Sequence, residues 1–322
     1  MNKLRAFPGW KTIVCLLIYS LIGLSAEATC RLQTGLSVGS GIISGQTAYS
    51  VGGHILTSAG EHQAPFPISR LVFPTDIDLF TLGAGFVIND RLECSFDWIQ
   101  NISNDPGKMR DYDWEIYSGQ MSIFSESRLD MDARMFSGKI QYPVFLGNLD
   151  QFAVFFHQSD QWRLLIGAEY LFRRFDFNAY DTLQTYPGRN TGPDFVAGRT
   201  LAYTVDFLIP LVEMGMTIKT AGGSSAELNF GYSPYTRARD LDRHLLRAMR
   251  SEADCEGSAF LLSCDFKFVF LKQWFAALHL SHLQIEADGT SRTVIDNEWD
   301  HTIDTEIKSR QSLATFRIGA GF

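Results

Sequence analysis

The sequence lacks the features of several common protein classes. Its 28 Lys and Arg residues are outnumbered by 36 Asp and Glu, so the chain offers no basic surface for nucleic acid. Beyond the first 24 residues, no apolar run approaches the ~18 residues that a membrane-spanning helix needs. Cysteine is scarce, with five residues in 322, and their spacing does not resemble a metal site. These absences argue against a nucleic-acid partner, a helical membrane anchor and a resident metal.

The N-terminus has the organisation of a secretory signal. Basic residues precede an apolar run over residues 12–24, and small residues follow at Ala26 and Ala28. The run is too short for a spanning helix and is typical of a cleaved export signal. We therefore expect a signal peptide over residues 1–28 and a single mature unit, the barrel, over residues 29–322.

The mature chain alternates apolar and polar residues in the manner of β-strands. Between Ser258 and Phe270 the even positions are aromatic or apolar, while the odd positions include Ser263, Asp265 and Lys267. This period of two gives each strand one oily face and one wet face. A soluble β-sandwich does not collect so many aromatic residues opposite charged ones. The pattern predicts strands that face lipid on one side and a polar lumen on the other.

Ten segments carry this alternation, and an even number is expected for a closed bacterial barrel. They lie near residues 31–46, 67–87, 91–103, 127–145, 160–178, 199–214, 225–240, 257–271, 273–287 and 309–322. Long polar connections at 47–66, 104–126, 179–198, 241–256 and 288–308 are expected outside the cell, since periplasmic turns are short. The predicted fold class is all-β, a transmembrane antiparallel β-barrel of about ten strands with long extracellular loops.

The C-terminal residues suit the same fold. Phe316, Ile318, Ala320 and Phe322 occupy alternate positions at the end of the chain. A terminal Phe that closes such a pattern resembles the insertion signal of bacterial outer-membrane barrels. We therefore expect the protein to be located in the bacterial outer membrane.

Four cysteines remain after removal of the signal. Cys30, Cys94, Cys255 and Cys264 are even in number, which permits disulfides in an oxidising compartment. The strand alternation places Cys94 and Cys264 on lipid-facing positions. That placement favours ordinary apolar cysteines over a bridge.

Two short acidic motifs lie far apart in the chain, each beyond a predicted strand. Residues i and i+2 of an extended segment point to the same side, so Asp111 pairs with Asp113, and Asp242 with His244. A neutral histidine oriented by a carboxylate is a good general base. Two carboxylates opposite it would bind the same water. Taken singly, each motif is typical of a solvated acidic loop or a cation site, but together they predict a hydrolytic site at the barrel mouth.

Residues around both motifs match the pattern of a known family. The run from Pro106 to Trp114 contains Asp111 and Asp113 followed by tryptophan, and an Asp-x-His dyad follows at Asp242 and His244. In these features, over nearly the whole mature chain, the sequence resembles the omptins, ten-stranded outer-membrane proteases. The resemblance implies that the two aspartates of the first motif bind the water. It also implies that the histidine is the base and its neighbouring aspartate the orienting partner.

The resemblance also implies substrate-binding residues. Ser127 matches a serine near the omptin site, and Leu129 replaces a histidine that the family usually carries. Omptins hold a basic substrate residue with two acids. Asp240 matches one of them, and Tyr49 stands where a glutamate is expected. A desolvated guanidinium prefers a carboxylate, so this change weakens the implied preference for Arg or Lys.

A lipid site is implied on the outer wall. Tyr170 and Arg174 match two positions at which omptins bind lipopolysaccharide, and both have lipid-facing parity. Phe172 and Asp206 replace a glutamate and an arginine of that patch. The implied partners are outer-membrane lipid, with lipopolysaccharide as a candidate activator, and a peptide or protein substrate at the cell surface. No other cofactor is expected.

Three function classes follow from these residues. The leading hypothesis is an endopeptidase with its active site facing outside, cleaving at basic residues through water activated between the Asp pair and the Asp-His dyad. The alternative is a non-catalytic omptin-like barrel that acts as an adhesin, binding protein or small pore. A lipid-modifying enzyme would need a Ser-His pair, for which Ser127 is the candidate serine.

Overall fold

A computed structural model describes residues 32–89, 91–148, 161–271, 273–296 and 298–321. In these residues the chain forms thirteen β-strands. Among them there is no helix long and apolar enough to cross a membrane. The expected signal peptide over residues 1–28, Cys30 and Phe322 lie outside the described residues.

The strands differ widely in length. The first six are β1 (Leu32–Thr57), β2 (Gly60–Gln63), β3 (Ser69–Pro74), β4 (Ile77–Ile88), β5 (Leu92–Asn101) and β6 (Gly107–Trp114). The other seven are β7 (Met121–Asn148), β8 (Gln161–Thr185), β9 (Asp194–Lys219), β10 (Ser225–His244), β11 (Met249–Val269), β12 (Trp274–Ile295) and β13 (Glu298–Gly321).

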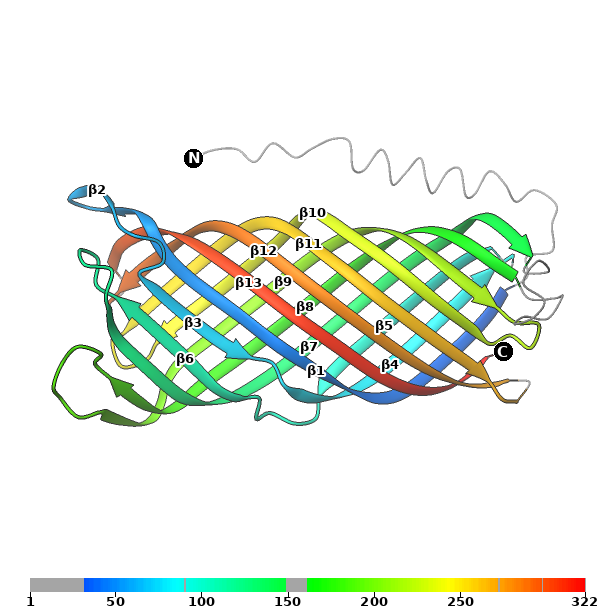
Figure 1. Cartoon of the computed structure of the whole chain (residues 1–322), viewed down its shortest axis with the longest axis horizontal. Helices are drawn as coiled ribbons and strands as arrows, with labels where there is room; N and C mark the ends of the chain where they lie inside the picture. Colours follow the sequence, from blue (N-terminus) through cyan, green and yellow to red (C-terminus); the bar gives the residue numbers. More distant parts are fainter. Residues whose placement is uncertain (1–31, 90, 149–160, 272, 297, 322) are drawn as a thin grey trace.

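Ten of these strands close into one antiparallel ring (Figure 1). The ring runs β13-β12-β11-β10-β9-β8-β7-β5-β4-β1, and β1 pairs back onto β13 from Gly35 opposite Gly321 to Thr57 opposite His301. Closure satisfies the backbone groups at both sheet edges, which a strand structure needs where lipid excludes water. The transmembrane antiparallel barrel predicted from the alternation is confirmed.

β3 and β6 rebuild the wall near one end of the barrel. There β1 pairs with β3, β3 with β6, and β6 with β7. At the other end the same gap is filled by β4 and β5. Because β6 lies within residues 104–126, the prediction of a loop over that segment was wrong. β6 pairs with β3, which is distant in sequence, and with β7, which follows it. The alternation typical of lipid contact does not mark these pairings.

The two faces of β9 exchange polarity along the strand. Toward its C-terminal end Val212 and Met214 are exposed on the outside, while Glu213 is buried inside. Nearer its start, Phe207 is buried inside and Asp206 lies on the outer face. Lipid requires apolar outward residues, whereas water outside the membrane does not. The reversal therefore marks the edge of the lipid-facing band.

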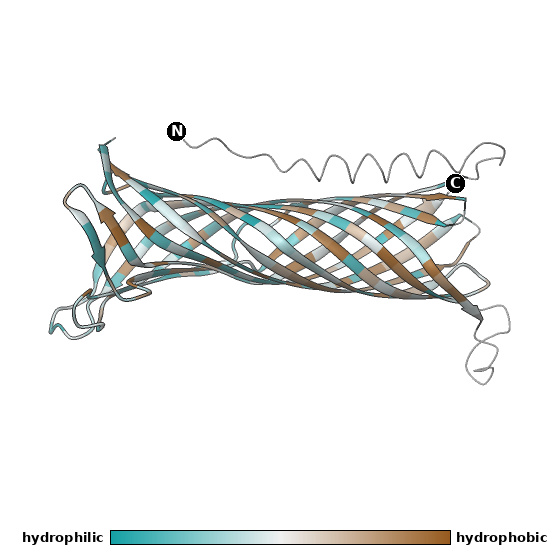
Figure 2. Cartoon of the chain, turned by 90° about the horizontal axis from the view of Figure 1, so that it is seen from above, coloured by the Kyte–Doolittle hydropathy of each residue, from teal (hydrophilic) through white to brown (hydrophobic). Residues whose placement is uncertain are grey.

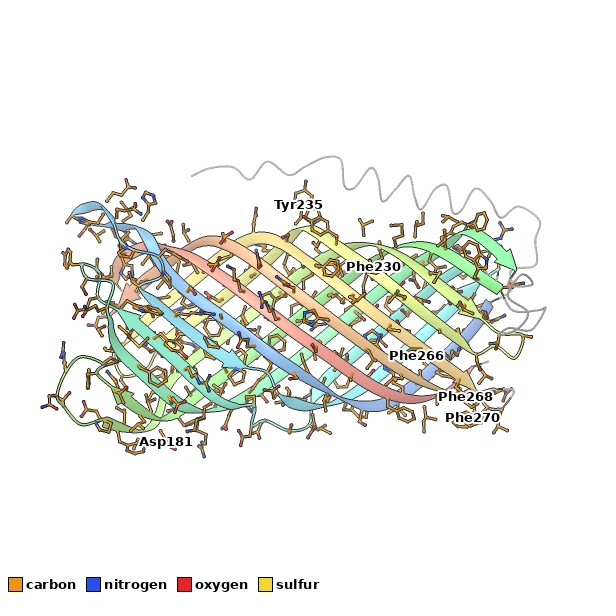
Figure 3. The ribbon with its side chains drawn as sticks, in the orientation of Figure 1. Asp181, Phe230, Tyr235, Phe266, Phe268 and Phe270 are labelled. Carbon is orange, nitrogen blue, oxygen red and sulfur yellow. The ribbon has the colours of Figure 1, made fainter. Side chains whose placement is uncertain are left out.

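The same band is visible on other strands. Figure 3 shows Phe230, Phe266 and Phe268 on the outside of the barrel, and Asp181 near the opposite end. Apolar and polar residues alternate along the strands in Figure 2. Cys94 and Cys264, which the alternation placed toward lipid, are half-buried, and Cys255 is buried. All three are free thiols. No disulfide therefore joins these three residues.

The strands continue well beyond the lipid-facing band. Segments 47–66, 179–198, 241–256 and 288–308 were predicted as loops. Strands occupy most of them, namely the ends of β1, β8, β9, β10, β11, β12 and β13 and the whole of β2. The lipid-type alternation ends at the membrane surface, because outward residues there need not be apolar. The backbone ladder does not end with it. The predicted strand boundaries were therefore too short at the outer end.

An aromatic core fills the lumen toward the outer end. Phe73 stacks on Phe177 at 4.7 Å and on Tyr203 at 4.6 Å between ring centroids. Phe175 and Leu129 are also fully buried in this core. Side chains from β3, β7, β8 and β9 therefore close the lumen at this level and form the floor of the mouth.

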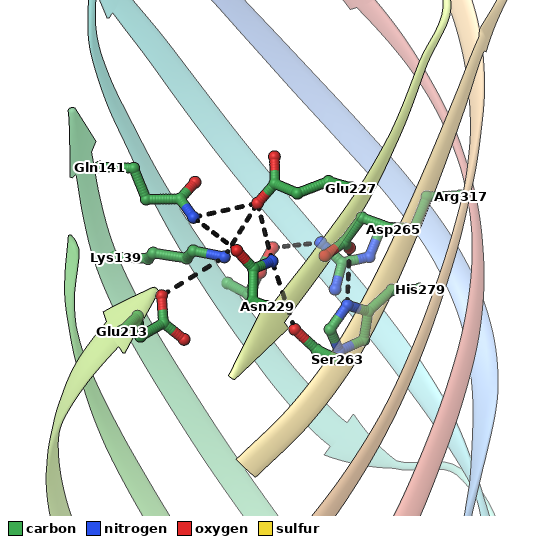
Figure 4. A network of polar contacts seen from close by, with 10 residues as sticks. Lys139, Gln141, Glu213, Glu227, Asn229, Ser263, Asp265, His279 and Arg317 are labelled. Atoms are coloured by element: carbon green, nitrogen blue, oxygen red, sulfur yellow. Dashed lines mark hydrogen bonds and ion pairs between the residues drawn. The ribbon is translucent and has the colours of Figure 1, made fainter. Parts of the chain in front are cut away.

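A polar network lines the lumen on the other side of this core (Figure 4). Lys139 Nζ donates to Glu227 Oε1 at 3.2 Å, and Gln141 donates to the same oxygen at 3.0 Å. His279 is hydrogen-bonded to Asp265 at 2.7 Å. These residues line a cavity of about 570 Å³. Buried charges are tolerated here because each has a partner of opposite charge or a hydrogen bond.

A charge on the lipid face is expected to destabilise the barrel. Phe230→Arg should lower the free energy of unfolding by about 2–4 kcal/mol, the cost of Arg near the bilayer midplane. Thr290→Arg, on the outer face beyond the band, should change it by less than about 0.5 kcal/mol. Urea unfolding in lipid vesicles measures both, and equal effects would contradict the assignment of the band.

Candidate active site

A cavity of about 260 Å³ opens at the outer end of the barrel. All four predicted catalytic residues line it: Asp111, Asp113, Asp242 and His244. They come from β6 and β10, on different sides of the ring. The closed wall thus brings together two motifs that are more than a hundred residues apart.

The last residues of β10 hold the histidine and its partner. His244 Nε2 is hydrogen-bonded to Asp242 Oδ2 at 3.1 Å. The two side chains share one side of the strand because they are two residues apart, and that side faces the cavity. The backbone N–H of Arg247 donates to the carbonyl of His244 at 3.1 Å and closes the turn that follows. Asp242 is buried, and its Oδ1 has no hydrogen-bond partner among the described residues.

The two other aspartates lie on β6 rather than in a loop. Asp111 is paired with Leu71 of β3 and Ser125 of β7, and Asp113 with Ser69 and Ile123. Two flanking ladders therefore hold both backbones. Alternation on this strand places the aspartates inward and sends the basic side chains of Lys108 and Arg110 outward to Glu126. The Oδ1 atom of Asp111 is buried without a hydrogen-bond partner in the described part of the chain.

Burial and neighbouring charges tune the groups in this cavity. Burial and the charge of Asp113 raise the pKa of Asp111 to about 7, although His244 and Arg247 oppose the rise. Burial alone would lower the pKa of His244, but the charge and the hydrogen bond of Asp242 outweigh it and raise the pKa above its ordinary value. An acid with a pKa of about 7 and a base with a raised pKa therefore share one cavity.

The predicted substrate-binding residues occupy different places. Tyr49 lines the cavity, and its hydroxyl donates to Ser291 Oγ at 3.2 Å. Asp240 lies buried behind it, accepting hydrogen bonds from Tyr203 Oη at 3.0 Å and from the N–H of Ala253 at 2.9 Å. Burial and the charge of Asp242 raise the pKa of Asp240 to about 7. Both carboxylate oxygens are thus engaged by the protein.

Ser127 lines the cavity as part of a chain of hydroxyl groups. Its Oγ lies 2.7 Å from Thr182 Oγ1, which lies 2.8 Å from Thr200 Oγ1. Leu129, two residues further along β7, is fully buried in the aromatic core. The position at which omptins usually carry a histidine therefore packs into the floor of the mouth.

The predicted lipid-binding residues lie on the outer wall of β8. Tyr170 is exposed there. The guanidinium of Arg174 donates to Asp176 at 3.0 Å and pairs with Asp206 at 3.5 Å. Two carboxylates thus compete with any anionic headgroup for this arginine. Its role in binding lipopolysaccharide stays a prediction.

The sequence pattern missed several residues that line the same cavity, and three of them come from the far side of the ring. They are Ser251, Thr293 and His301, on β11, β12 and β13. All three lie in segments that had been predicted as loops. The only sequence signal for them is that the alternation of inward and outward positions continues along these strands beyond the lipid-facing band. Among the described residues, no group of three or more His, Cys, Asp or Glu is arranged to hold a metal ion.

A family comparison agrees with this geometry. The model of the omptin family matches residues 76–321. The chain belongs to the omptin family. The matched region contains the aspartates of β6 and the dyad of β10, whereas Tyr49 precedes it.

The fold is also similar to that of a solved structure. The outer membrane protease OmpT from Escherichia coli matches with a TM-score of 0.74 at 14% identity, covering 90% of this chain and 97% of that chain. Two other barrels match with TM-scores too low to indicate the same fold. The outer membrane protein OprG from Pseudomonas aeruginosa scores 0.38 at 7% identity, covering 90% of this chain and 95% of its own. The translocator domain of the autotransporter NalP from Neisseria meningitidis scores 0.32 at 8% identity, with coverages of 97% and 95%. No curated protein sequence matched the chain.

Removal of the Asp242 charge is expected to lower the pKa of His244. In Asp242→Asn the charge that raises this pKa is lost, and burial, which lowers it, remains. Titration of the imidazole by NMR in detergent micelles measures the change. Asp254→Asn, on the outer wall beside Arg237, should leave the pKa of His244 as in the wild type. An unchanged or higher value in Asp242→Asn would contradict the described dyad.

Proposed function

We propose that this omptin-family barrel is an outer-membrane endopeptidase whose cleft faces the outside of the cell. The observation that carries the proposal is one cavity lined by two aspartates of β6 and by the hydrogen-bonded Asp242 and His244 of β10. Family membership and the fold shared with an outer membrane protease support it.

The proposed reaction is direct attack of water on the peptide carbonyl. Asp111 and Asp113 hold the water, and neutral His244 takes one of its protons while Asp242 stabilises the resulting imidazolium. The oxygen of water bonds to the carbonyl carbon, and the bond from that carbon to nitrogen breaks after the nitrogen gains a proton. The products are a carboxylic acid and an amine. No acyl-enzyme forms.

The geometry is less favourable to the other two functions. The stacked rings of Phe73, Phe177 and Tyr203 fill the lumen below the mouth, which argues against a small pore. Ser127 is hydrogen-bonded to Thr182, and no contact between Ser127 and His244 is found in the described residues. This argues against a Ser-His nucleophile. An adhesin remains the outcome if the barrel folds and cleaves nothing.

Cleavage should depend on both couples of the site. Barrel refolded in detergent is assayed with a quenched peptide library that includes an Arg-Arg bond, with and without lipopolysaccharide. Asp113→Asn and His244→Ala should each lower the rate by ~100-fold or more, the scale of general acid–base groups. Asp288→Asn, on the exposed outer face, serves as the matched control.

The pH profile adds a second readout of the same proposal. The wild-type rate should fall as the pH drops through the raised pKa of His244, because the base must be neutral to accept a proton. Rates that are unchanged in both variants would rule out the mechanism. A folded barrel without activity on the library would favour the binding protein instead.

The preference for basic residues implied by the omptin resemblance is expected to be small. One acid of that subsite is Tyr49, and Asp240 already accepts two hydrogen bonds from the protein. Its pKa of about 7 also leaves it partly neutral at physiological pH. A guanidinium would therefore find no fully ionised, accessible carboxylate at this position.

Restoring an acid should restore the preference. Tyr49→Glu is expected to raise the ratio of cleavage at Arg to cleavage at Leu by about tenfold, the scale of one hydrogen bond to a charged group. Tyr49→Phe, which keeps the ring and loses only the hydroxyl that bonds to Ser291 and Thr305, should leave that ratio near the wild-type value. Matched peptides that differ only at the residue before the scissile bond measure it. A ratio unchanged by the glutamate would place the subsite elsewhere.

A further inference from the structure

A second Asp-His pair lies at the mouth of the barrel, on β13. His301 Nδ1 is hydrogen-bonded to Asp300 Oδ2 at 2.5 Å, and His301 lines the same cavity as the dyad of β10. The imidazole is mostly buried, with 25% of its side chain exposed, while Asp300 is half exposed. Neither residue takes part in the reaction described above.

A β-bulge makes this pair. Consecutive residues of a strand point to opposite faces, so a regular strand keeps such neighbours apart. In the ladder with β12, His301 is paired with Thr293 and Trp299 with Val294, which leaves Asp300 as the extra residue. A bulge re-aims side chains and is common beside active sites. Here it lets the carboxylate reach the ring nitrogen of its neighbour.

The strand register places this histidine on a flank of the cavity between the two catalytic couples. Asp242 is paired with Ser251, Ser251 with Thr293, and Thr293 with His301, on four successive strands. A hydrogen bond of 2.9 Å joins the two hydroxyl groups in the middle of this row. Three strand spacings amount to about 14 Å along the wall, and less across the curved lumen. The β6 aspartates are also three strands away in the ring, by way of β3 and β1.

Peptide hydrolysis needs a proton donor as well as a base. An amide anion is a poor leaving group, so the nitrogen must be protonated before the bond to carbon breaks. An alkoxide is a better leaving group and departs from an ester without prior protonation. With Nδ1 directed to Asp300, the Nε2 atom of His301 is the ring nitrogen left for the cavity. A base at His244 and an acid at His301 would flank a peptide bond held between them.

We propose that His301, oriented by Asp300, is a further catalytic residue that protonates the leaving amine. This rests on the proposed peptidase function. In the balanced step, His244 gains a proton from the attacking water and Nε2–H of His301 gives one to the amide nitrogen as the bond from carbon to nitrogen breaks. Proton exchange with solvent then restores both rings.

A pair of substrates with different leaving groups tests this role. The first is a peptide that the wild type cleaves, and the second replaces its scissile N–H by oxygen to give the matching ester. His301→Gln should lower amide cleavage by ~100-fold or more while it changes ester cleavage by less than about threefold. Asp300→Asn should show the same selectivity with a smaller loss. His244→Ala should impair both substrates.

The control is a second histidine at the same end of the barrel. His54 is exposed, bonded to Glu61 and absent from the cavity wall, so His54→Gln should leave both rates unchanged. Folding of each variant is checked by its circular dichroism and its heat-dependent gel mobility. Equal losses on amide and ester, or no loss in His301→Gln, would overturn the role of His301 and leave the peptidase intact. A folded wild type that cleaves no peptide of the library, so that no such substrate pair can be made, would overturn both proposals.

Discussion

The closed ladder of backbone hydrogen bonds is the constraint on which the rest of this structure depends. Lipid offers no partner for an unpaired N–H or C=O, so the sheet must end on itself. The pairing of β1 with β13 over most of their length achieves this. Because the ladder continues beyond the lipid-facing band, the barrel wall extends into the aqueous phase. The candidate site stands on this extension.

The polarity of the wall reverses where the lipid ends, and the contents of the lumen change with it. Within the band, polar groups such as Lys139 and Glu227 face inward and pair with one another. Above it, the inward residues include Phe207 and Tyr203, which pack as a core. The mouth therefore has a solid floor. The mouth is therefore a closed cleft rather than a channel.

Burial in this closed cleft changes the pKa values of its acidic residues. In a solvated loop Asp111 would stay ionised at neutral pH, but burial and Asp113 raise its pKa to about 7. His244 experiences opposing effects, and the contact with Asp242 prevails over burial. The protonation of both groups is therefore set by the cleft rather than by contact with bulk water.

Much of the barrel could be read from local pattern. Lipid contact imposes a side-chain parity that is visible within a single strand, as between Ser258 and Phe270. The outer halves of the strands could not be read in this way. There the outward residues are polar, so β6, with Lys108 and Arg110 on its outer face, looks like a loop. Only its pairing with β3 and β7 makes it a strand.

The sequence by itself determined the class of fold and the grouping of residues within each motif. Asp111 with Asp113, and Asp242 with His244, share a side because alternation along a strand is a local property of the backbone. The tertiary structure alone decided that both motifs line one cavity and that His301 joins them. Those relations depend on ring closure and on register between strands that are distant in sequence, which no local pattern encodes.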